Sequence, residues 1–169
     1  MVPPEVQILT VVLWLIVMKF CQMTTYPYLK PAVGNLSYGL GYPFSILVLT
    51  FVTWYLGLVD LPVQLALLLF AAAGVYAIAS KKYDRTEIQQ NLKWDLVFFG
   101  AFALMLISRF LTPGIIPSGE KFMDAAFLGS IMLSPTVTPL DPWYAGGELS
   151  IYFYLGHLVC GVLGILSTG

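Results

Sequence analysis

Charged residues are scarce in this sequence. Eight Lys or Arg and nine Asp or Glu make up 10% of its 169 residues, against roughly 25% charged residues in an average soluble domain. So few charges cannot cover the surface of a soluble domain of this length, and 59% of the chain is hydrophobic, which favours an integral membrane protein. The formal net charge is -1, so the chain has no basic field to attract nucleic acid, and we expect no nucleic-acid partner.

Cysteine is also rare. Cys21 and Cys160 both fall within apolar stretches, where a thiol packs as a small hydrophobic group, so we expect no disulfide. The N-terminus has Glu5 and no Lys or Arg before its first apolar stretch. It therefore lacks the basic start of a signal peptide, and we expect the first helix to stay in the mature protein.

Five apolar runs are each about as long as the roughly 20 residues that a membrane-spanning helix needs. They cover residues 6–23, 41–59, 61–80, 92–111 and 149–167. The pattern predicts an all-α, polytopic membrane protein with about five transmembrane helices. Asp60 and Pro62 separate the second and third runs; Asp60 is expected to cap the start of the third helix, with Pro62 in its first turn.

The runs divide the chain into three regions. Residues 1–111 form a four-helix N-terminal membrane region, residues 112–148 an external acidic and aromatic loop, and residues 149–169 the fifth transmembrane helix.

Four of the eight cations lie between the third and fourth runs: Lys81, Lys82, Arg85 and Lys93. The positive-inside rule places this 81–93 loop in the cytoplasm of a multi-pass cell-membrane protein. The N-terminus, the Asp60 turn and the 112–148 loop then lie outside, and the loop that holds Lys30 lies inside.

The outer loop begins with a segment that predicts a short amphipathic helix over residues 119–128. Glu120 and Asp124 stand four residues apart and so project from one face, while Phe122 and Phe127 supply apolar side chains. Such a helix lies along the membrane surface. The two carboxylates indicate either a general base or divalent-cation site, or merely a solvated face.

Later in the loop, Asp141 and Pro142 precede Trp143, Tyr144 and two glycines. These residue types are typical of a turn, and the aromatic pair suits the membrane interface. Two interpretations remain open: an anchored structural turn, or a surface cleft for substrate lined by Asp141 and Trp143.

The fifth run holds His157, the only histidine of the chain. A single His is most often a hydrogen-bonded packing residue, but its place in a membrane run also allows a functional role. Gly156, Cys160 and Gly164 form a stripe of small residues, with Gly161 beside it, and this stripe predicts a close contact with another helix.

Three motifs together resemble a known family: EKFMDAAFL at 120–128, DPWYAGG at 141–147 and YFYLGH at 152–157. The family comprises polytopic membrane proteins of unknown function and is named for a Tyr-Tyr-Tyr run. The run is Tyr152-Phe153-Tyr154 here, and Ile151 replaces a common Asn. The resemblance is closest over residues 114–169; the first four helices agree mainly in hydropathy and in the position of the basic loop.

That family is distantly similar to membrane glycosyltransferases of the C-type fold, which take sugar from a lipid-phosphate carrier. In that class the first outer loop carries an essential acidic residue on a membrane-parallel helix. The resemblance implies Asp124 as general base or metal-linked carboxylate, with Glu120 beside it, a divalent metal ion as candidate cofactor and a polyprenyl-phosphate sugar as donor. The residues it implies for substrate binding are Asp141, Trp143, Tyr152, Tyr154 and His157.

Relatives of both kinds are usually several times longer. We therefore expect this chain to be a module: the N-terminal part of a larger architecture, a short member, or a subunit that needs additional membrane subunits. The alternative is a non-catalytic scaffold or assembly subunit whose outer loop docks a partner, in which Trp143 and Tyr144 matter more than the carboxylates. A transporter is less favoured, because the few charges within the runs, mainly Lys19, Asp95 and Arg109, are expected near their ends.

Overall fold

The computed structural model describes residues 4–111, 119–133, 140–149 and 151–168. In this part of the chain the regular structure is helical, apart from one isolated β-bridge between Leu140 and Glu148, so the all-α prediction is confirmed there. The elements are α1 (Pro4–Val33), the 3-10 turn η1 (Gly34–Leu36), α2 (Ser37–Leu58), α3 (Leu65–Ala79), α4 (Arg85–Leu111), α5 (Gly119–Leu133) and α6 (Ile151–Thr168).

Two helical stretches are long and apolar enough to cross a membrane. They are Glu5–Leu58, which holds α1, η1 and α2, and Arg85–Leu111, which is α4. By contrast α3 has 15 residues and so rises only about 22 Å, less than a hydrocarbon core of roughly 30 Å. Helices matching each predicted run are present, while the number that cross the membrane stays a prediction.

The segment between the first two runs was expected to be a loop, and this expectation is wrong. Helix α1 continues through Pro27 and Pro31 to Val33, and the chain reverses only at Gly34, whose φ of 57° is readily reached by glycine. Tyr26 in the continued part is fully buried. Packing of this extra length against α2 therefore outweighs the hydrogen bonds that two prolines remove.

Asp60 also differs from its expected role. It adopts φ 54° and ends α2, because its N–H donates to Gly57 O (3.3 Å) and the next N–H, of Leu61, donates to Leu56 O (2.9 Å). This pair of bonds is the Schellman arrangement that closes a helix C-terminus. Helix α3 begins only at Leu65.

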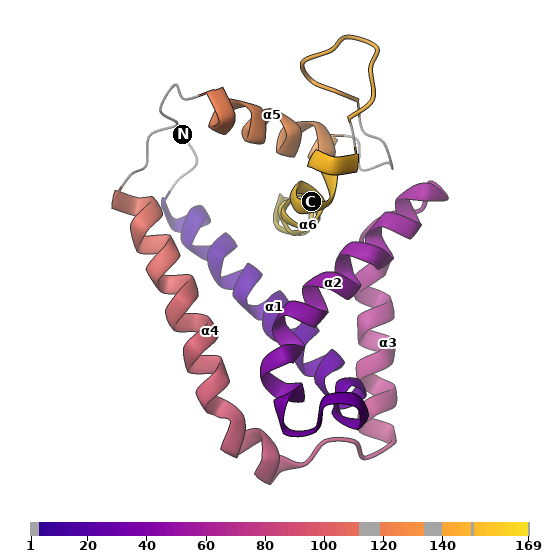
Figure 1. The fold of residues 1–169 in the computed structure, drawn as a ribbon, viewed down its shortest axis with the longest axis vertical. Coiled ribbons are helices and arrows are strands. Elements are labelled where there is room, and N and C mark those ends of the chain that lie inside the picture. The colour runs from indigo at the N-terminus through magenta and orange to yellow at the C-terminus, as the bar shows by residue number, and fades with distance from the viewer. Residues whose placement is uncertain (1–3, 112–118, 134–139, 150, 169) are drawn as a thin grey trace.

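Figure 1 shows how the helices are arranged. The start of α1, the end of α2 and the end of α4 lie toward one end of the molecule, and α5 lies at that end too, crosswise to α4. The α3–α4 connection and η1 lie at the opposite end. Helix α6 is viewed nearly along its axis beneath α5, so it crosses the direction of α3 and α4.

Two apolar clusters hold these helices together. One joins α1, α2 and α3 through Cys21, Leu49, Ala66 and Phe70. The other joins α5 and α6 and includes Phe127, Ile131, Leu149, Leu158 and Val162, together with Val63 from the α2–α3 connection. The second cluster fixes α5 on α6, which positions Asp124, an acidic residue singled out in the sequence.

Candidate functional site

The structure brings together two of the residues predicted from sequence, Asp124 and His157. Asp124 lies on α5 and His157 on α6, and His157 Nε2 is 3.3 Å from Asp124 Oδ1. The Asp124 side chain is 58% exposed and that of His157 25% exposed, so the pair stays open to an incoming molecule. The ring of Phe127 meets the imidazole edge-on, with ring centroids 5.7 Å apart.

The α5–α6 contact that forms this pair depends on glycine. A Cβ atom at Gly161 would lie 2.6 Å from Ile131 Cγ2, and one at Gly164 would lie 2.9 Å from Met132 Sδ. The predicted close contact is thus found at Gly164 and at the neighbouring Gly161. At Gly156 a Cβ would meet nothing within 4 Å, and Cys160 is exposed.

Asp141 organises a tight turn. Its carboxylate accepts a hydrogen bond from the N–H of Trp143 (2.8 Å), and its own N–H donates to Gly147 O (2.9 Å). Gly146 has φ 81°, a conformation that favours glycine. The Asp141 carboxylate therefore supports the turn, while Trp143 and Tyr144 are exposed on it.

The remaining predicted residues give no side-chain geometry. Glu120, Tyr152 and Tyr154 lie in helical segments, but their side chains are outside the described residues. Within the described residues no three His, Cys, Asp or Glu side chains are grouped so as to hold a metal ion. A metal role for Asp124 stays a prediction.

An apolar groove of about 640 Å³ lies on the other side of α6. Its walls come from α1, α2, α4 and α6 and include Trp14, Phe51, Phe102 and Cys160. Gly156, which precedes His157 in sequence, also lines it. Its volume is typical of a ligand site, roughly 300–1,000 Å³.

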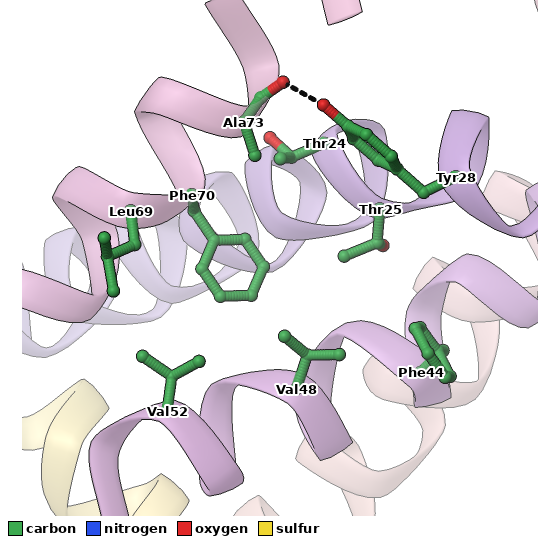
Figure 2. Close-up of a pocket in the computed structure, with 9 residues that line it drawn as sticks. All are labelled: Thr24, Thr25, Tyr28, Phe44, Val48, Val52, Leu69, Phe70 and Ala73. Carbon is green, nitrogen blue, oxygen red and sulfur yellow. Dashed lines mark hydrogen bonds between the residues drawn. The ribbon is translucent and has the colours of Figure 1, made fainter. Parts of the chain in front are cut away.

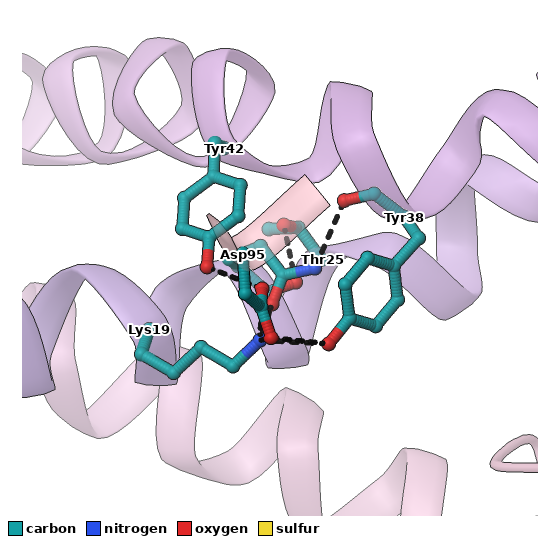
Figure 3. Close-up of polar contacts among 6 residues, drawn as sticks. Lys19, Thr25, Tyr38, Tyr42 and Asp95 are labelled. Carbon is teal, nitrogen blue, oxygen red and sulfur yellow. Dashed lines mark hydrogen bonds and ion pairs between the residues drawn. The ribbon is translucent and has the colours of Figure 1, made fainter. Parts of the chain in front are cut away.

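Deep among α1, α2 and α4 lies a polar network centred on Asp95 (Figure 3). Lys19 Nζ is 2.7 and 2.8 Å from the two carboxylate oxygens of Asp95. Tyr42 donates its hydroxyl proton to Oδ1 (2.6 Å) and Tyr38 donates to Oδ2 (3.0 Å). Lys19 also donates to Tyr38 Oη (2.8 Å) and to Gln22 Oε1 (3.1 Å).

The charged groups of this network have their hydrogen-bond partners within it. Each Asp95 oxygen accepts two hydrogen bonds, and the Lys19 ammonium has three donors for its surrounding acceptors. Next to this network, the rings of Tyr42 and Phe98 stack with their centroids 4.0 Å apart. Trp94 of α4 packs directly against Gly39 of α2, where an added Cβ would lie 2.9 Å from Trp94 Cδ2. These contacts attach α4 to the α1–α2 hairpin.

One family matches the chain: the uncharacterized membrane protein family DUF2298, over residues 48–168. The chain belongs to this family. No curated protein and no solved structure matches it. The DUF2298 match includes Asp95, Asp141 and both members of the Asp124–His157 pair, and it begins after Lys19 and Tyr42.

In this DUF2298 member, sequence reasoning missed the Lys19–Asp95 pair. From the sequence, both residues are expected near helix ends, with no pairing between them. The signal was present, because each is an ionisable residue inside an otherwise apolar run and their charges are opposite. Such residues within a membrane usually pair with one another.

Proposed function

We propose that this DUF2298 chain is a membrane-embedded module of an enzyme that transfers sugar from a lipid-phosphate carrier. In this proposal Asp124 and His157 form its acid–base pair at the outer face. The observation that carries the proposal is the approach of the two side chains to 3.3 Å across α5 and α6, although the residues stand 33 positions apart in sequence. The motif resemblance described above supplies the reaction class.

The proposed reaction needs one proton acceptor. The oxygen of an acceptor hydroxyl bonds to the anomeric carbon of the sugar, and the bond from that carbon to the lipid phosphate oxygen breaks. The hydroxyl proton passes to the Asp124–His157 pair, in which the carboxylate orients the imidazole and stabilises its charged form. The lipid phosphate leaves with the bonding electron pair.

Two further features support this assignment. The exposed Asp124 carboxylate can meet a polar acceptor, and the apolar groove that includes Gly156 offers a place for the carrier's hydrocarbon chain. The position of α5 along the outer surface belongs to the same proposal. It puts the pair on the side where the positive-inside rule places the 112–148 loop.

Sugar transfer from a panel of polyprenyl-phosphate hexoses, measured in membranes that hold the full assembly, tests the proposal. Asp124→Asn removes the carboxylate that supports the charged imidazole and should lower the rate by about 10²–10⁴-fold, the usual contribution of acid–base catalysis. Asp60→Asn makes the same chemical change at an exposed turn whose positive φ Asn tolerates, and should leave the rate unchanged. Equal rates for Asp124→Asn and Asp60→Asn would refute the proposal.

A second candidate function is a docking scaffold, favoured by one observation. Trp143 and Tyr144 are 62% and 71% exposed on the turn that the Asp141 hydrogen bonds support. Exposed aromatic side chains on a fixed turn suit either the membrane interface or a protein partner. Trp143→Ala should then abolish co-purification of membrane subunits while Asp124→Asn preserves it; retained subunits after Trp143→Ala would contradict docking.

A further inference from the structure

A second cavity, of about 250 Å³, lies between α1, α2 and α3 (Figure 2). Val48 and Val52 of α2 face Leu69 and Phe70 of α3 across it, and Tyr28 of α1 stands at one end. The lining is almost wholly apolar, so hydrocarbon is the chemistry that it suits.

Tyr28 connects this cavity to a cationic group. Its hydroxyl donates to Ala73 O (2.6 Å), and Lys82 Nζ lies 4.3 Å from the centre of its ring. Lys82 Nζ is also 5.3 Å from the centre of the Tyr76 ring. Among the described residues, Lys82 has these ring contacts and no ion pair with a carboxylate.

Lys82 is set close to the end of α3 by the backbone. Lys81 adopts φ 50°, its N–H donates to Ile78 O (3.0 Å), and the Lys82 N–H donates to Ala77 O (3.0 Å). This closes α3 and lets the Lys82 side chain fold back over Tyr28 and Tyr76. Lys81 and Arg85 flank Lys82 in sequence and are exposed, as is Asp84 between Lys82 and Arg85, so the segment keeps a net positive charge. Lys82 brings this charge to Tyr28, which lines the cavity.

We propose that this is a binding site for one anionic phospholipid. The Lys82 ammonium binds the phosphate of the head group, and part of one acyl chain enters the cavity beside Val52 and Leu69. Basic pockets between membrane helices on the cytoplasmic side bind anionic head groups in this way, and the positive-inside rule places Lys82 on that side. The site is independent of the proposed sugar transfer.

Native mass spectrometry of the whole chain in mild detergent tests the head-group contact. The protein is titrated with phosphatidylglycerol and with phosphatidylcholine that carries the same acyl chains. Wild type should bind phosphatidylglycerol more tightly, and Lys82→Gln should weaken that binding about fivefold, as expected for one Lys beside an anionic lipid, without changing phosphatidylcholine binding. Lys93→Gln removes the same charge from α4, where Lys93 lies over Trp94, and should change neither.

A second pair of variants tests the cavity. Ala73→Leu fills it and should weaken binding of both lipids, whereas Ala72→Leu changes an exposed neighbour and should not. Val52→Phe fills the cavity from the opposite wall and replaces Ala73→Leu if that variant does not fold. Equal losses for Lys82→Gln and Lys93→Gln, or full lipid binding after the cavity is filled, would overturn the proposal.

Discussion

Replacing Asp95 by Leu removes the centre of the polar network between α1, α2 and α4. Lys19 loses both of its carboxylate contacts, at 2.7 and 2.8 Å, and the hydroxyls of Tyr38 and Tyr42 lose their acceptor. We expect a large fall in the free energy of unfolding, because a charge then remains in an apolar surrounding without its partner.

The size of this effect can be bounded. Removing one member of a buried ion pair costs about 3–5 kcal/mol. The Lys19 side chain is 28% exposed, so its ammonium recovers part of its solvation, and we expect the lower end, about 3 kcal/mol. Lys19→Met combined with Asp95→Leu removes both charges and should regain at least half of the loss, since apolar replacement of a buried pair is often neutral.

Reversible unfolding in mixed micelles of a mild detergent and sodium dodecyl sulfate, followed by tryptophan fluorescence, measures these differences. Glu87→Gln is the control, because it breaks the Lys30–Glu87 pair of 2.6 Å in which Lys30 is 45% exposed; such a pair contributes up to about 1 kcal/mol. The reasoning is refuted if Asp95→Leu costs no more than Glu87→Gln, or if the double variant is as unstable as Asp95→Leu alone.

Three other predictions concern the packing and the turns. Gly161→Ala should lower the free energy of unfolding by about 1–3 kcal/mol, as overpacking does, because the added Cβ would lie 2.6 Å from Ile131 Cγ2. In the same unfolding assay Gly156→Ala should have little effect, since a Cβ there meets nothing within 4 Å. Asp60→Gly should raise stability by up to about 1 kcal/mol, since glycine fits φ 54° better; a loss would contradict the Schellman ending of α2. Burial raises the pKa of Tyr83, so the phenol ionises more readily in the unfolded state. Stability should therefore fall as the pH rises above the ordinary tyrosine pKa near 10. Tyr83→Phe should make this fall shallower, and an unchanged pH profile in the variant would contradict the prediction.

The helical positions follow from hydropathy because an apolar run of about 20 residues has few alternatives in a membrane. The ends of the helices do not follow in the same way. The segment after the first apolar run is expected to be a loop, yet the buried Tyr26 and its neighbours hold α1 in helical form through Pro27 and Pro31 to Val33. Side-chain packing between two helices decided that boundary, and a pattern read along one segment does not contain it.

The candidate site was partly predictable for a related reason. Asp124 and His157 could each be singled out from local sequence, but their 3.3 Å approach depends on how Gly161 admits Ile131 between α5 and α6. Asp141 was correctly placed in a turn, whereas its substrate role has no support beyond the resemblance. The Lys19–Asp95 pair joins positions 76 residues apart, and only the tertiary arrangement of α1 and α4 reveals it.

The central claim is that Asp124 and His157 act together in sugar transfer. The most direct test is the rate of transfer from a polyprenyl-phosphate hexose in Asp124→Asn, His157→Gln and the double variant. Residues that act as one unit give non-additive losses, so we expect each single variant to lose about 100-fold or more and the double variant to be no slower than the worse single one. Losses that multiply in the double variant, or wild-type rates in either single one, would contradict the account.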